Sequence, residues 1–285
     1  MTVKTPLKWV GSKVRIMPQL IDHLPEGKRL VEPFAGSCAV MMNTDYDEYL
    51  IADLNPDLVN LYKVMAYHTD AFLMELETLF SAGALGEQES RAIFYYAVRD
   101  AFNSSGKGVG SESVEAAARF MYLNRHCFNG LCRYNRRGQF NVPFGKYNKN
   151  YFPLKEVRAF AEKAKRATFI TAHYSETLGL VRAGDVVYCD PPYLTESGNF
   201  TSYTDTGFSH LDQGRLARRL RRLARAGVGV VASNSDLEMV RYLYAGFNFV
   251  QINAPRGVGA AAASQKKAAE LILKSPLDSI ARACA

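Results

Sequence analysis

The sequence Asp185-Val-Val-Tyr-Cys-Asp-Pro-Pro-Tyr193 decides how the rest of the chain is interpreted. Its valines, tyrosine and cysteine are typical of a buried strand, which the two prolines end because proline has no N–H for a sheet ladder. The strand stops on Asp190, and the rigid Pro191 and Pro192 and the ring of Tyr193 follow. This set suits an amine-bearing aromatic ring that stacks on Tyr193 and points its amino hydrogens at Asp190 and the Pro191 carbonyl. A plain strand end followed by a Pro-Pro turn is the alternative.

Two earlier strands end on residues suited to a nucleotide-like ligand. The strand expected over 30–32 runs into small residues between Pro33 and Val40, and the strand over 49–52 ends on Asp53. A strand–turn–helix binds such ligands at the helix N-terminus, and an acidic residue about twenty positions later meets ribose hydroxyls. The G-x-G-x-x-G fingerprint and a phosphate loop are absent. The pattern favours an adenosine-containing cofactor.

The remaining periodicity alternates helices with strands, which predicts an α/β fold. Expected helices cover 14–24, 157–166, 211–226 and 236–244, and further strands cover 167–172, 185–189, 228–234, 247–252 and 270–273. Residues 55–122 are mostly helical in pattern, and this stretch is too long for an ordinary crossover. We therefore expect a catalytic domain of residues 1–54 and 148–285, with residues 55–147 inserted as a second domain.

The amino-acid composition limits the classes of protein to which this chain can belong. The chain has 285 residues, 48% of them hydrophobic, and no apolar run long enough for a transmembrane helix or a signal core. Its five cysteines form no CxxC pair and no zinc spacing, which predicts a reducing cytoplasm and no metal site. The net charge of +7 and the pI near 9.1 favour a polyanionic partner, although this signal alone is weak.

The segment 124–147 mixes arginine, asparagine and aromatic residues. Asn129-Gly130 predicts a hairpin turn, and Arg137-Gly138 offers another. Arginine contacts guanine, asparagine can read adenine, and aromatic rings can fill the space that an extruded base leaves. A solvated basic hairpin is the alternative, and the flanking motifs favour contact with DNA.

Three other features have competing interpretations. Trp9, beside a Gly-Ser turn and Lys13, is either a core anchor or an aromatic wall from which Lys13 reaches a carboxylate or phosphate. His173 is expected to be a loop histidine rather than a catalyst. The arginines of the helix 211–226 are expected to form a solvated face, with DNA contact as the lesser possibility.

Together these motifs resemble the Dam family of DNA adenine-N6 methyltransferases, which recognise GATC. The resemblance follows family order along nearly the whole chain, and no single motif carries it. The matching stretches are LKWVGSK at 7–13, EPFAGSC at 32–38, IADLN at 51–55, LNRHCFNGLCRYN at 123–135, GQFNVPFGKY at 138–147, VVYCDPPY at 186–193 and NFTSY at 199–203.

The resemblance implies a Rossmann-like methyltransferase sheet that uses S-adenosyl-L-methionine, with an inserted, mainly helical DNA-recognition domain that carries a β-hairpin. It implies roles for three sets of residues. The catalytic set is Asp190, Pro191, Pro192 and Tyr193. The cofactor set is Trp9, Lys13, Pro33, Phe34, Ala35, Gly36, Ser37, Asp53, Tyr174 and Asp190. The DNA-binding set is Lys8, Arg125, Phe128, Asn129, Leu131, Arg133, Asn135 and Lys146.

By this resemblance the partner is double-stranded DNA, with no membrane and no obligate protein partner, and the enzyme is cytoplasmic and associated with the nucleoid. The adenine N6 lone pair is delocalised into its ring, so Asp190 and the Pro191 carbonyl would accept both amino hydrogens and localise that lone pair towards the methyl donor. Three positions depart from the family pattern: Cys38 replaces a smaller residue, Phe128 a frequent tyrosine and Lys146 a frequent arginine.

Other functions remain open at this point. A cytosine-N4 methyltransferase would use the same amine chemistry with a pocket fitted to cytosine. A methyltransferase acting on RNA or on protein amides would have no use for the arginine and asparagine segment. A catalytically silent DNA-binding regulator would need neither the intact Asp190 motif nor the cofactor loop.

Overall fold

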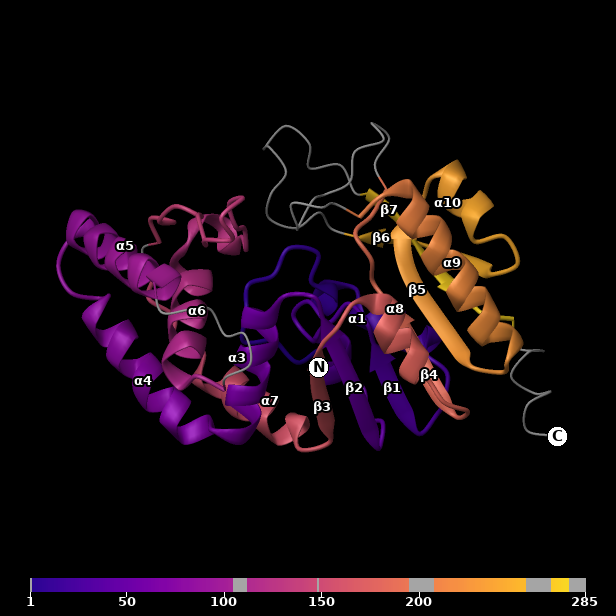
Figure 1. Cartoon of the computed structure of the whole chain (residues 1–285), viewed down its shortest axis with the longest axis horizontal. Coiled ribbons are helices and arrows are strands. Elements are labelled where there is room, and N and C mark those ends of the chain that lie inside the picture. Colours follow the sequence, from indigo (N-terminus) through magenta and orange to yellow (C-terminus); the bar gives the residue numbers. More distant parts are fainter. Residues whose placement is uncertain (1, 105–111, 148, 195–207, 255–267, 277–285) are drawn as a thin grey trace.

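The computed structural model describes residues 2–104, 112–147, 149–194, 208–254 and 268–276 (Figure 1). Its centre is a seven-stranded sheet with the strand order β3-β2-β1-β4-β5-β7-β6. Strands β1 to β5 run parallel, and β7 is antiparallel to both β5 and β6. The strands are β1 (Arg29–Glu32), β2 (Glu48–Asp53), β3 (Ala167–Thr171), β4 (Asp185–Cys189), β5 (Gly229–Ser235), β6 (Asn248–Ala254) and β7 (Ala268–Lys274).

Helices cover the sheet and extend beyond its β3 edge. In Figure 1, α3 to α7 gather beside β3, α8 lies near the middle of the sheet, and α9 and α10 lie near the opposite end. The long helices are α3 (Pro56–Tyr67), α4 (Thr69–Ala82), α5 (Gln88–Ser104), α6 (Val114–His126), α7 (Leu154–Ala164) and α9 (His210–Arg225). The short ones are η1 (Lys13–Arg15), α1 (Met17–Leu20), η2 (Ile21–His23), α2 (Ala39–Asn43), η3 (Phe128–Gly130), α8 (Tyr174–Thr177), η4 (Leu178–Leu180) and α10 (Glu238–Leu243).

Apolar side chains divide into two clusters, one on each face of the sheet. The larger cluster continues from the sheet into α3 to α7, where Tyr62 stacks on Phe160 with ring centroids 5.4 Å apart. The smaller cluster joins β4 and β5 to α9 and α10. Every residue of β4 is buried, as expected for a central parallel strand covered on both faces. None of the described helices is long and apolar enough to cross a membrane.

The helix expected over 14–24 is wrong as one element. The structure divides this stretch into η1, α1 and η2, and Pro18 stands in the first turn of α1. Proline cannot donate the intrahelical hydrogen bond that a helix begun at residue 14 would need at that position. The other expected helices and strands agree with the structure to within a few residues at each end.

Residues 127–144 fold back on themselves without forming named strands. Asn129 and Gly130 both have positive φ, and the Leu131 N–H donates to the Phe128 carbonyl, so the expected turn is present. Isolated antiparallel bridges pair Cys127 with Phe144 and Tyr134 with Phe140.

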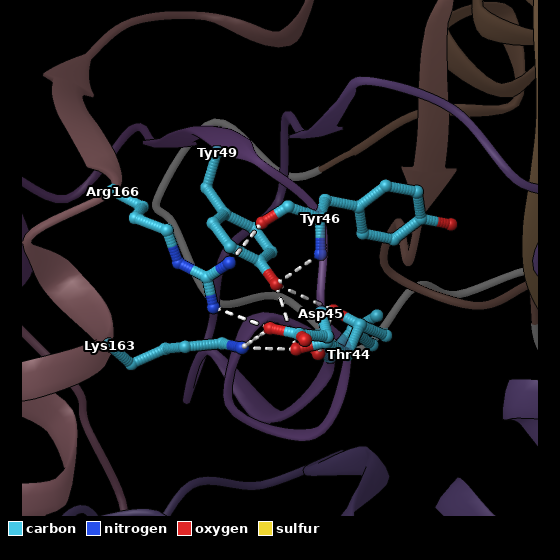
Figure 2. Close-up of polar contacts among 7 residues, drawn as sticks. Thr44, Asp45, Tyr46, Tyr49, Lys163 and Arg166 are labelled. Atoms are coloured by element: carbon cyan, nitrogen blue, oxygen red, sulfur yellow. Dashed lines mark hydrogen bonds and ion pairs between the residues drawn. The ribbon is translucent and has the colours of Figure 1, made fainter.

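At the amino-terminal edge of the sheet, charged side chains link the turn before β2 to the end of α7 (Figure 2). The Arg166 guanidinium donates to Asp45 at 2.6 Å and to the Tyr46 carbonyl at 2.8 Å. Lys163 donates to the Thr44 carbonyl and lies 3.4 Å from Asp45. Two cations, Lys163 and Arg166, thus pair with the single carboxylate of Asp45.

Candidate active site

Acidic residues at the ends of three parallel strands converge on one edge of the sheet. Glu32 is the last residue of β1, Asp53 the last of β2, and Asp190 follows β4. Parallel strands end at the same edge, which is where ligands of open α/β sheets bind. The topology thus brings together residues that lie more than 150 positions apart.

Asp190 is held by one lysine. Its Oδ2 atom lies 2.6 Å from the Lys13 ammonium, and the side chains of Lys13 and Asp190 are 8% and 20% exposed. The other oxygen, Oδ1, is buried and has no hydrogen-bond partner among the described residues. Burial raises the pKa of Asp190, while Lys13 counteracts part of that rise. An acceptor atom shielded from water and left without a donor is suited to a ligand N–H.

Side chains from two other elements fix the backbone after Asp190. Gln213 of α9, which is fully buried, donates from Nε2 to the Pro192 carbonyl at 2.8 Å. Ser235, at the end of β5, donates to the Leu194 carbonyl at 2.8 Å. Tyr193 is therefore held on both sides, and the Lys13 ammonium lies 5.0 Å from the centre of its ring.

The loop after β1 is anchored to the end of β2. The Ala35 N–H donates to the Ala52 carbonyl, and the Gly36 N–H donates to Asp53 Oδ2 at 3.1 Å. Gly36 has a φ of 49°, and a Cβ atom there would lie 3.1 Å from Trp9 Nε1. Asp53 Oδ1 accepts from the Asn55 N–H at 3.0 Å. Backbone N–H groups thus bind both Asp53 oxygens, and the carboxylate has acceptor capacity left for a hydroxyl donor.

Other predicted cofactor residues surround this loop. Trp9 is half-buried and packs both on the apolar core and against Gly36, so each of its two interpretations is met in part. Ser37 contacts the Ser12 hydroxyl at 2.9 Å. Phe34 stacks on Tyr174, which α8 contributes, with ring centroids 5.5 Å apart. Pro33 and Ala35 lie in the same loop.

Cys38 closes the loop at some conformational cost. It is fully buried and takes a left-handed conformation with a φ of 56°, which residues with a Cβ atom adopt rarely. A smaller residue at this position, as in the family pattern, would relieve that strain if it were glycine.

Glu32 and Glu270 belong to this edge and were missed by the sequence interpretation. Glu32 is 2% exposed and accepts the Met41 N–H at 2.8 Å. Burial, together with the negative charge of Asp190, raises the pKa of Glu32 to about 8. Its place at the end of a strand could have identified it. Glu270 could not be placed without the pairing of β7.

Lys8 and Arg125 tie the N-terminal segment to the end of α6. Lys8 donates to the Arg125 carbonyl at 2.8 Å, and its ammonium lies 3.5 Å from the centre of the Tyr147 ring. Burial and the charge of Arg125 lower the pKa of Lys8 to about 8. Arg125 lies 5.0 Å from the Tyr151 ring, and burial lowers its pKa. Both cations are partly withdrawn from solvent.

The turn residues present more of their surface. The Phe128 side chain is 50% exposed, which is unusual for a large apolar ring, and Leu131 is half-buried. Arg133 is exposed and donates to Asn141 Oδ1 at 2.8 Å. Asn135 Oδ1 accepts the Arg137 and Gln139 N–H groups, so it shapes the second turn. Lys146 is exposed with a φ of 47°.

The positions of His173 and of the α9 arginines agree with expectation. His173 lies in the loop before α8 and caps this helix: its ring accepts the Ser175 N–H, and its backbone N–H donates to Glu176. The arginines of α9 lie mostly on the exposed face of the helix: Arg215, Arg218, Arg219, Arg222 and Arg225 are exposed, and Arg221 is half-buried.

Comparison with known proteins gives a consistent set of relatives. Residues 9–258 match the model of the family described as D12 class N6 adenine-specific DNA methyltransferase. The chain is 49% identical to the retron Ec67 DNA adenine methylase of Escherichia coli, over 96% of this chain and 92% of that one. It is 43% identical to a DNA adenine methylase of Serratia marcescens, over 93% and 96% of the two chains. It is 38% identical to the DNA adenine methylase of Escherichia coli K12, over 93% of each.

Proposed function

The chain belongs to the D12 class N6 adenine-specific DNA methyltransferase family, and we propose that it transfers a methyl group from S-adenosylmethionine to adenine flipped out of duplex DNA at GATC. Membership makes the chain a DNA adenine methyltransferase and disfavours the cytosine and RNA alternatives. The methyl donor, the GATC sequence, the flipping step and the residue roles are our proposals.

The observation that carries the proposal is that the two carboxylate oxygens of Asp190 have different environments. One oxygen is neutralised by Lys13 and the other is buried without a donor. An ionised carboxylate accepts an amine hydrogen more strongly than a neutral carboxyl group does, and Lys13 favours the ionised form of Asp190 against its burial. Adenine N6 would place one hydrogen on Oδ1 and the other on the Pro191 carbonyl, while Tyr193 holds the ring by stacking. Pro192 fixes the chain between them.

The residues near the β1 and β2 ends fit the proposed cofactor. Asp53 retains acceptor capacity for ribose hydroxyls, and the bare Gly36 backbone allows a close approach beside Trp9. Phe34 and Tyr174 offer an aromatic surface, and Lys13 reaches from η1 to Asp190. When bound, S-adenosylmethionine would supply an electrophilic methyl group. The protein's own contribution is to orient the amine and to take up the N6 proton at Asp190.

We also propose a division of labour within the chain. Residues 1–54 and 148–285 form the catalytic part, and 55–147 form the recognition part with its hairpin. Exposed Phe128 would enter the duplex beside Asn129 and Leu131, with Arg133, Asn135 and Lys146 on bases or phosphates. Lys8 and Arg125 are already engaged with the protein, so we assign them to shaping this surface and to contacting phosphate with their remaining N–H groups.

Transfer of labelled methyl to two matched duplexes tests the proposal. One duplex contains a single GATC and the other GTTC in the same flanks. Label on N6 of adenine in GATC alone is the expected result. Equal label on both would overturn the GATC assignment and the recognition role of 124–147. No label on either, with tight DNA binding, would overturn the catalytic proposal.

A further inference from the structure

Strand β7 brings a carboxylate to the site from the far end of the chain. Because β7 runs antiparallel, its first residues lie at the edge where the parallel strands end, and Glu270 pairs in register with Ser235 of β5. The Tyr193 hydroxyl donates to Glu270 Oε2 at 3.2 Å. No motif in the sequence connects these residues, which lie 77 positions apart.

Glu270 is kept at this place against its electrostatic preference. Burial raises its pKa, as does the charge of Asp190, whereas Lys13 and the Tyr193 hydroxyl lower it. Lys13 is also the counter-ion of Asp190, so one described ammonium serves two neighbouring carboxyl groups. An apolar residue here would avoid the cost of burying a carboxyl group, which indicates a use for this acceptor.

The contacts that hold Tyr193 indicate what the Glu270 carboxyl group does. Gln213 and Ser235 fix the carbonyls on either side of it, and neither hydrogen bond sets the plane of the ring. Glu270 engages the far end of the ring, at the hydroxyl, and the Ser233 hydroxyl also acts on that group. A tether at the tip of the ring limits the plane that the ring can adopt.

We propose that Glu270 is a positioning residue, which holds the Tyr193 hydroxyl so that the ring lies in the plane on which the target adenine stacks. The inference rests on the proposed stacking of adenine on Tyr193. Glu270 does not touch the reacting atoms, and it acts through the orientation of one aromatic ring. A stacked base that can tilt would present its amino hydrogens poorly to Asp190.

A double-mutant cycle tests the pair in the full chain. We expect E270A to slow single-turnover methylation about tenfold, the size of one hydrogen bond to a charged group. Y193F should slow it at least as much, because its hydroxyl also interacts with Ser233 and Asp190, and the double variant should be no slower than Y193F. Affinity for S-adenosylmethionine should stay within about twofold. E270Q should recover most of the rate, since its amide oxygen can still accept the phenol hydrogen.

The controls separate the possible failures. E48Q changes a carboxylate on β2 at the opposite, exposed edge and should keep the wild-type rate. Effects of E270A and Y193F that multiply would overturn the coupling, and an E270Q rate as low as that of E270A would show a role of charge rather than position. A wild-type enzyme that methylates no adenine would instead overturn the proposed function. 2-Aminopurine at the target position should lose its stacking quench in E270A and not in E270Q.

Discussion

Carboxylates at the two ends of the parallel strands differ in how they are paired with cations. At the amino-terminal edge, Asp45 pairs with Arg166 and Lys163 (Figure 2), and its carboxylate is exposed to water. At the carboxyl-terminal edge, Asp190 and Glu270 share Lys13, Glu32 is buried beside them, and Asp190 Oδ1 has no donor among the described residues. The first arrangement is complete by itself. The second leaves Asp190 Oδ1 available to the amine hydrogen that the proposed function places there.

The pKa shifts follow the same division. Burial raises the pKa of Glu32, Asp53, Asp190 and Glu270, whereas the nearby arginine and lysine lower the pKa of Asp45. Perturbed carboxyl groups gathered in one place are typical of functional sites. The difference teaches that the charges at the amino-terminal edge are paired within the fold, whereas the carboxyl-terminal edge gathers the perturbed groups to which we assign the chemistry.

The largest expected effect concerns Glu32, whose replacement by glutamine should remove a pH-dependent loss of stability of up to about 5 kcal/mol. Its pKa is about 8 when folded and near 4.5 when exposed. Between these values the folded chain keeps a proton that the unfolded chain has released, so the free energy of unfolding falls as pH rises. Urea unfolding of wild type and E32Q from pH 5 to 8.5 should show a difference that moves steadily in favour of E32Q. A constant difference would contradict a neutral, buried Glu32.

Two lysines of similar burial provide a matched pair. Lys13→Met should slow methylation about a hundredfold or more, because Asp190 loses its counter-ion. Removing Lys13 raises the pKa of Asp190 further, so the remaining activity should rise with pH above the wild-type optimum. Lys163→Met should keep the rate and lower the melting temperature, since it affects only the edge around Asp45. An equal loss of methylation rate in Lys13→Met and Lys163→Met would contradict the proposed difference between the two edges.

Phe128 allows a similar comparison at the surface that we propose contacts DNA. Phe128→Ala should lower the methylation rate on a paired duplex about tenfold, the size of one lost aromatic stacking contact. The loss should be smaller when the target adenine is mismatched, because less unstacking is then required. Tyr242→Ala, which removes a ring 76% exposed on α10, should leave both rates unchanged. Equal losses on paired and mismatched duplexes would contradict a role in opening the duplex.

The smallest effect is expected at Asp45. Asp45→Asn leaves an exposed position without its charge, and exposed ion pairs contribute little in water. Steady-state methylation should stay within about twofold of wild type at moderate salt. A large loss of activity would mean that the two edges are mechanically coupled.

Much of this arrangement could be predicted from the sequence. Strand ends at Glu32, Asp53 and Asp190 follow from apolar runs that stop at polar residues or proline. The stretch 14–24 is not one helix, because Pro18 has no N–H for a helix that begins at residue 14. The pairing of Lys13 with Asp190 and the place of Glu270 depend on strand order, which local patterns do not encode. The burial of Lys8 and Arg125 likewise follows from tertiary packing.

The most direct test of the central claim compares binding with methyl transfer in Asp190→Ala. We expect no labelled methyl on N6 of adenine, while affinity for a GATC duplex stays within a few-fold of wild type, because the recognition surface does not include this carboxylate. Asp236→Ala, near the end of β5, serves as the control and should retain both properties. Comparable loss of methyl transfer and of duplex binding in Asp190→Ala would contradict the assignment of Asp190 to catalysis.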